Sequence, residues 1–180
     1  MKLLPKIALG VTLTALTGAA AYPHIDAYRK SLPVNMTKEQ AAKRYLQSVC
    51  PVNKINDQAI ETQKKFNEEL KVTYYDPAAL ARANNRVGAL NNNLISLAHR
   101  KSDALVVQSK ALSDPKFIWP QEIRKDISFM AADAFANAAN MKQAIKGEEI
   151  QADPKNVTET GNTASRIRMF LNLPVRGEGC

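Results

Sequence analysis

The stretch from Asp76 to Ser113 constrains the fold of this chain more than any other. It begins with Asp76-Pro77, an N-cap residue followed by proline at the first helical position, and no further proline follows for about 36 residues. Apolar residues recur within it at alternating steps of three and four: Leu80, Ala83, Val87, Leu90, Leu94 and Leu97. This spacing predicts one helix, about 54 Å long at ~1.5 Å per residue, with a narrow apolar stripe. Such a helix is not stable alone in water, so it needs partner helices.

A first partner helix is predicted to begin at the capping box Thr37-Lys38-Glu39-Gln40. An apolar stripe runs along it from Ala42 to Thr73 and includes two polar members, Asn56 and Gln63. Pro51 interrupts the hydrogen-bond ladder, but the stripe continues beyond it, which favours one bent helix over two separate ones. The connection to Asp76 is short, so the two helices are expected to form an antiparallel hairpin. Lys101 falls on the seam, and beyond it the stripe weakens, which predicts a more solvated or differently packed end.

Two more helices are predicted after the hairpin. The third runs from Pro120 to Lys146 and ends at Gly147, a C-terminal cap. After a polar surface loop, a short fourth helix is capped by Asn162 or Thr163 and ends before Pro174. Aromatic residues make up only 6% of the chain and alanine is abundant, which favours closely packed helices over sheets. The predicted fold is all-α: an elongated antiparallel bundle of three long helices plus one short C-terminal helix.

The beginning of the chain reads as an export signal. A positive leader, Met1 to Lys6, precedes an apolar run that ends in Ala19-Ala20-Ala21, an A-x-A cleavage pattern. We therefore predict a signal peptide over 1–21, an extended lead-in over 22–36 and a single bundle domain over 37–180. An uncleaved membrane anchor is the alternative, although the apolar run is short for a span of ~20 residues. The expected location is secreted, or periplasmic within the cell envelope.

The two cysteines, Cys50 and Cys180, are far apart in the sequence. In an exported protein an even pair indicates a disulfide. We expect it to form within one chain, and a bridge between two chains is the alternative.

The sequence contains no recognisable set of catalytic or metal-binding residues. Its two histidines are His24, in the lead-in, and His99, which is predicted on the outer face of its helix. Neither has a second ligand at metal-binding spacing, and no nucleophile elbow, phosphate-binding loop or dinucleotide fingerprint occurs. We therefore expect a non-enzymatic protein without a metal or cofactor.

Two groups of residues are candidates for binding a partner. Phe117, Ile118 and Trp119 form an apolar cluster inside a loop, where they are expected to plug the end of the bundle; an exposed binding knob is the alternative. The formal net charge is +8, or +6 without Lys2 and Lys6. Basic residues predicted on outward faces can steer acidic partners, and they include Arg82, Arg86, Arg166 and Arg168.

Met36-Thr37-Lys38-Glu39-Gln40 resembles the L-T-x-x-Q element of the small helical periplasmic stress chaperones of the Spy type. Those proteins carry the element twice, whereas this sequence has it once, with Met in place of Leu. The resemblance implies binding of unfolded client proteins. It covers five residues that also form an ordinary capping box, and it assigns no family.

Three functions follow from these observations. The leading hypothesis is an exported bundle that binds another macromolecule or stabilises a cell-envelope assembly. A protein partner is expected, an acidic polymer or anionic membrane surface is the alternative partner, and specific nucleic-acid recognition is not expected. The second hypothesis is a small-ligand carrier with an interhelical cavity, motivated by the polar seam residues Asn56, Gln63 and Lys101. The third is the stress chaperone.

Overall fold

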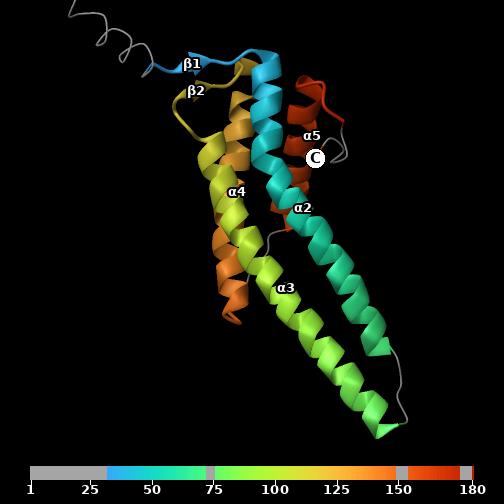
Figure 1. Cartoon of the computed structure of the whole chain (residues 1–180). Coiled ribbons are helices and arrows are strands. Elements are labelled where there is room, and N and C mark those ends of the chain that lie inside the picture. Colours follow the sequence, from blue (N-terminus) through green and yellow to red (C-terminus); the bar gives the residue numbers. More distant parts are fainter. Residues whose placement is uncertain (1–31, 72–75, 149–153, 175–179) are drawn as a thin grey trace, which may run out of the picture. The chain divides into compact units, whose positions relative to one another are not determined.

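The computed structural model describes residues 32–71, 76–148, 154–174 and 180 (Figure 1). The chain divides into two units, residues 1–32 and 33–180, and the secondary structure described belongs to the second. Its elements are β1 (Val34–Asn35), α2 (Lys38–Lys71), α3 (Pro77–Leu112), β2 (Phe117–Ile118), the 3-10 helix η1 (Gln121–Ile123), α4 (Arg124–Ile145) and α5 (Pro154–Phe170). The predicted signal peptide lies outside the described residues, so the proposed domain boundaries stay a prediction.

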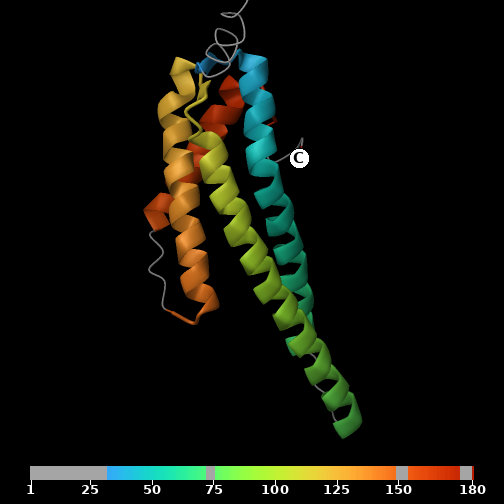
Figure 2. The same cartoon turned by 60° about the vertical axis from the view of Figure 1, so that its left-hand side comes forward.

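The predicted all-α fold is confirmed: α2, α3 and α4 are long helices that pack together, and α5 is shorter. The α3 helix packs against both α2 and α4, and α5 packs mainly on α4 and η1. Figures 1 and 2 show α2 and α3 as an antiparallel hairpin with α4 beside it. None of the helices in the described ranges is long and apolar enough to cross a membrane.

Local signals set the ends of the helices. The capping box is formed as predicted: the Gln40 backbone N–H donates to Thr37 Oγ1 at 3.3 Å, and the Thr37 N–H donates to Gln40 Oε1 at 3.0 Å. Asp76 accepts from the first backbone N–H groups of α3 and caps that helix. Gly147 has φ +77°, which identifies it as the left-handed residue that ends α4.

Pro51 lies inside α2, which is one continuous helix as predicted. Proline has no N–H, so the carbonyl four residues earlier loses its helical partner and the helix can bend there. Figure 1 shows the axis of α2 changing direction part-way along the helix.

The hydrophobic core lies at the end of the unit where four helices meet, which we call the base. Its main cluster includes Tyr45, Leu112, Ile123, Ile127 and Ile167. We expected α3 to be either more solvated or differently packed beyond Lys101, and the second alternative is confirmed, because Leu105, Gln108 and Leu112 are all buried. In the base α3 has a helix on each side, so residues outside the narrow stripe are also covered.

The rest of the hairpin extends beyond the other helices, as Figure 2 shows; we call residues 60–71 and 77–93 the arm. Among the described residues of the arm only Thr62 and Ala83 are buried. Leu70 and Leu80, two positions of the predicted stripes, are exposed. The stripe therefore forms a seam between two helices here, without the third helix that would bury it.

The fourth helix is longer than predicted. It begins at Pro154, not at Asn162, so residues 154–161 of the expected surface loop are helical. Asp153-Pro154 repeats the N-cap and proline signal of Asp76-Pro77, but the polar sequence that follows it lacks an apolar stripe.

Candidate functional site: a polar cleft between two helices

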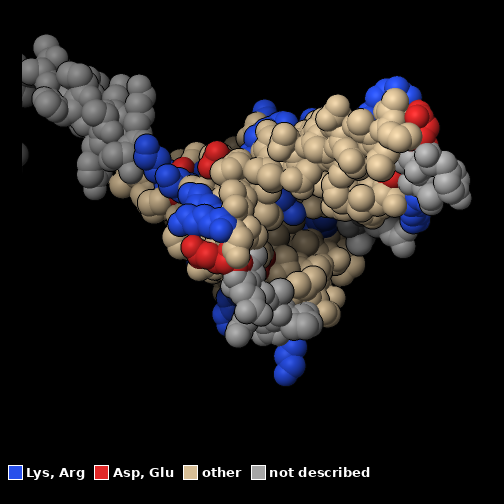
Figure 3. All heavy atoms as spheres, turned by 90° about the horizontal axis from the view of Figure 1, so that it is seen from below, with Lys and Arg blue, Asp and Glu red and all other residues tan. Residues whose placement is uncertain are grey.

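A cleft of 570 Å³ lies between α2 and α5. Its walls are α2 and α5, and its floor is formed by residues of α3 and α4, among them Leu105, Gln108, Met130 and Ala134. The cleft exists because α2 packs on α3 and α5 packs on α4, and the two outer helices have few contacts with each other. Figure 3 views the unit from below and shows a hollow on that face.

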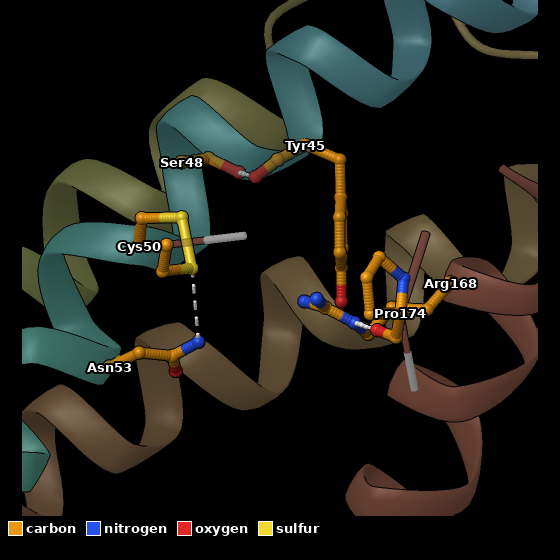
Figure 4. Close-up of a disulfide and its surroundings, with 7 residues drawn as sticks. Tyr45, Ser48, Cys50, Asn53, Arg168 and Pro174 are labelled. Carbon is orange, nitrogen blue, oxygen red and sulfur yellow. Dashed lines mark hydrogen bonds between the residues drawn. A yellow bond between two sulfur atoms is a disulfide. The ribbon is translucent and has the colours of Figure 1, made fainter. Parts of the chain in front are cut away.

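One end of the cleft is formed by Tyr45 and Arg168. Figure 4 shows the hydroxyl of Tyr45 pointing toward Arg168, whose Nε donates to the backbone oxygen of Pro174. Burial raises the pKa of Tyr45, and the nearby positive charge of Arg168 offsets part of that rise. Arg168 was predicted to face outward, and this is wrong: its exposed fraction is 4%, because its side chain turns back under the chain that leaves α5.

The disulfide Cys50–Cys180 lies at the same end, with a Cα–Cα distance of 5.1 Å. The predicted bond within one chain is therefore confirmed. Cys180 lines the cleft, and its Sγ accepts from Nδ2 of Asn53 at 3.6 Å (Figure 4). The bond joins α2 to Cys180, which follows α5 in the chain.

The other end of the cleft is built around Asp133 of α4, whose exposed fraction is only 8%. Its Oδ2 accepts from Asn137 Nδ2 at 2.9 Å, and its Oδ1 accepts from Asn156 Nδ2 at 3.2 Å. The second bond connects α4 to the first turn of α5. Asp57, which is exposed, also lines the cleft, from α2.

Sequence reasoning missed Asp133. A signal was present, since this is the one charged residue in the alanine-rich run from Ala131 to Ala139. A carboxylate on an otherwise small, apolar helix face is a candidate for a buried polar role.

The predicted polar seam is half confirmed. Lys101 Nζ donates to Asn56 Oδ1 at 2.9 Å across the α2–α3 interface, and burial lowers the pKa of Lys101. Asn56 also lines the cleft. Gln63 does not belong to a buried seam, because it is exposed and donates to Asn67 on its own helix.

The three residues of the apolar loop cluster differ in how deeply they are buried. Trp119 is buried, and its Nε1 donates to the carbonyl of Leu112 at 3.0 Å, so it plugs the base as expected. Phe117 and Ile118 are half-buried and form β2, which pairs in parallel with β1 in the register Val34 to Phe117. The Arg44 guanidinium stacks on the Phe117 ring at 3.7 Å.

A second, mainly apolar groove of 520 Å³ lies beside this plug. Phe117 and Trp119 line it from the loop, and Phe135 lines it from α4. The exposed fraction of Phe135 is 65%, a high value for a phenylalanine.

The structure does not bring the candidate arginines together. Arg82 and Arg86 lie in the arm, where Arg86 forms a bidentate pair with Glu69 at 2.8 and 3.0 Å. Arg166 of α5 pairs with Asp126 at 2.8 Å and with Glu159 at 3.2 Å. In Figure 3 the basic side chains form separate groups and uncharged atoms cover most of that face. Partner binding by these residues stays a prediction.

Within the described parts of the chain, no group of three or more His, Cys, Asp or Glu side chains could hold a metal ion. His99 is exposed, as predicted. No family model, curated protein or solved structure matches the chain. The cleft and the apolar groove are therefore the two features from which a function can be argued.

Proposed function

We propose that the protein is a non-enzymatic binding protein that holds a small polar ligand in the cleft between α2 and α5. The observation that carries the proposal is the combination of a 570 Å³ space with a buried carboxylate, Asp133, on its lining. Binding sites for small molecules commonly measure about 300–1,000 Å³ and combine apolar walls with a few fixed polar groups. The cleft has both, since Val49, Val52 and Leu105 line it together with carboxamide side chains.

Hydrogen bonds within the lining support a preformed site. The Asp133 carboxylate is oriented by two amide donors, and Asn56 is oriented by Lys101. Polar groups that are held in place before binding lose less conformational entropy when a ligand arrives. The disulfide fixes Cys180, another lining residue, to the wall formed by α2.

We also propose that this binding protein is exported. A disulfide between cysteines 130 residues apart in sequence is the kind of bond that persists in oxidising compartments. Cleavage after Ala21 would be checked by N-terminal sequencing of the exported protein, where an intact Met1 would contradict it.

A thermal-shift screen with small polar molecules tests the binding function. Compounds that bind the native cleft raise the melting temperature with concentration. The variant Gly161→Leu places a side chain in the cleft, where an added Cβ meets no atom within 4 Å, and it should abolish the shift. Gly88→Leu is the matched control in the arm, because an added Cβ has the same free space there. A shift that survives Gly161→Leu would place binding elsewhere.

A second candidate function is docking of a protein partner on the apolar groove. Phe135 favours it, because a large exposed aromatic residue beside an apolar groove is typical of protein interfaces. The occupant would be a short partner segment with one or two apolar side chains. Affinity capture from the exported fraction should retain a partner with the native chain and lose it with Phe135→Asp. Met169→Asp, at another exposed apolar residue, is the control, and equal loss with both variants would contradict a specific groove.

A further inference from the structure

The charge of Asp133 lacks a counter-ion within the described chain. The structure records no ion pair for it there, and its two recorded hydrogen-bond donors are the uncharged amides of Asn137 and Asn156. Removing a carboxylate from water is costly unless a cation or several donors compensate it. Each carboxylate oxygen has about two lone-pair sites, so the two amides leave further sites for a donor in the cleft.

The cleft is electrically asymmetric along its length. Asn156, which contacts Asp133, is twelve residues before Arg168 on α5, which corresponds to about 18 Å along a helix. Tyr45, near Arg168, and Asp57 are also twelve residues apart on the opposite wall, α2. One end therefore carries the guanidinium, and the other carries two carboxylates, Asp57 and Asp133.

Lys101 is a cation that is bonded to the lining of the cleft, through Asn56. Its ammonium donates to Asn56 Oδ1, and it forms no recorded ion pair with either carboxylate. Lys101 therefore orients the cleft wall without taking the place of a cationic ligand at Asp133.

We infer that the ligand of the cleft carries a protonated amine, which binds Asp133 at the end of the cleft to which α2 contributes Asp57. This inference rests on the proposed binding function and adds the ligand class. An ammonium group supplies the charge and the N–H donors that the Asp133 carboxylate lacks. The net charge of +8 repels cations from the surface in general, so amine binding would mark a specific site.

Isothermal titration of the full, oxidised chain with matched probes tests the inference. Putrescine and 1,4-butanediol have the same carbon skeleton, but only putrescine is cationic, and succinate is the anionic counterpart. Putrescine should bind, and the other two probes should not. Spermidine, a longer amine, tests whether the ligand extends along the cleft.

Two variants and two controls locate the site. Asp133→Asn should weaken amine binding about 10- to 100-fold, the range for a hydrogen bond to a charged group. The new amide faces two amide donors, so its fold is checked by circular dichroism. Gly161→Leu blocks the cleft without touching Asp133 and should abolish binding. Asp103→Asn, at an exposed carboxylate, and Gly88→Leu should leave binding unchanged.

The outcomes distinguish a failure of the amine inference from a failure of the proposed binding function. If butanediol or succinate binds, putrescine does not, and Gly161→Leu removes the binding, the amine inference is wrong and the cleft remains a binding site. If putrescine binds equally to the native chain and Gly161→Leu, both the inference and the proposed function are wrong. If none of the probes binds, the amine inference is overturned.

Discussion

The base and the arm are built from the same two helices, yet they bury their side chains very differently. Leu112, at the base end of α3, has an exposed fraction of 2%, whereas Leu80, at the arm end, has 46%. Both residues belong to apolar patterns with helical spacing. The difference is the number of neighbours: α3 is covered by α2 and α4 in the base, and by α2 alone in the arm.

This contrast shows that the regularity of an apolar stripe does not indicate how deeply its side chains are buried. The regular stripe from Leu80 to Leu97 lies largely in the arm, and the irregular one after Lys101 lies in the core. A two-helix seam needs a strict three-and-four spacing because only one strip of each helix is covered. A helix with two neighbours can bury off-stripe residues, and Ser102 does so by donating to the Ala138 carbonyl at 3.1 Å.

Loss of the disulfide should have the largest effect on this contrast. The double variant Cys50→Ser and Cys180→Ser removes a covalent link over 130 residues, which is worth up to about 5 kcal/mol in the chain-entropy model. Urea denaturation should show the loss in the free energy of unfolding. Hydrogen exchange should speed up in the base and change little in the arm. An equal change in both would show that they unfold as one unit.

Leucine truncations measure the contrast directly. Leu112→Ala in the base should cost about 2–5 kcal/mol of unfolding free energy, because it leaves a cavity in a packed core. Leu80→Ala in the arm should cost less than about 1 kcal/mol, because that side chain is already half in water. The same denaturation assay compares them. Similar costs at the two positions would mean that the arm is buried in solution, for instance by a partner.

Replacing two helical glycines with alanine should change the free energy of unfolding by less, and should increase it. Gly161→Ala in α5 and Gly88→Ala in α3 each add a methyl group with no atom within 4 Å, and neither glycine has a positive φ. Each should stabilise its helix by about 0.5–1 kcal/mol. Gly161→Ala should raise the melting temperature of the base, whereas Gly88→Ala should slow exchange in the arm. A loss of stability at either site would contradict the local helix geometry.

The smallest effect is a pH dependence confined to the base. Burial raises the pKa of Tyr45 above its ordinary value of 10.0, so the unfolded chain loses the phenolic proton more readily than the folded one. The stabilisation is complete below about pH 10 and is lost as the pH rises through the folded-state pKa. The variant Tyr45→Phe, measured at each pH, isolates the stabilisation that is linked to the Tyr45 hydroxyl. The difference in unfolding free energy between the native chain and this variant should diminish above pH 10. A free-energy difference that stays constant with pH would contradict the raised pKa of Tyr45.

Much of the fold could be predicted from the sequence because its signals are local. The capping box at Thr37, the cap at Asp76, and Gly147 each act within a few residues, and the disulfide needed only two cysteines. The start of α5 was missed because its N-cap signal precedes a polar segment that is held by contacts with α4, such as Asn156 with Asp133.

The candidate site was less predictable. Its residues come from four helices, and their convergence depends on how those helices pack. Arg168 illustrates the limit: helical spacing assigned it to the outer face, but the chain after α5 folds over it and covers the guanidinium. Asn56 and Lys101 were found because both fall on the stripes, where a polar residue stands out.

Cys50 and Pro51 are neighbours in α2 and act on the cleft in opposite ways. The proline releases one carbonyl from the ladder and allows α2 to bend there, while the cysteine ties α2 to the end of the chain after α5. The opening thus depends on the course of the main chain as well as on the size of the side chains that face it. Lining residues can therefore be exchanged for others of similar size without closing the space, and a change of ligand in evolution would require no change of architecture.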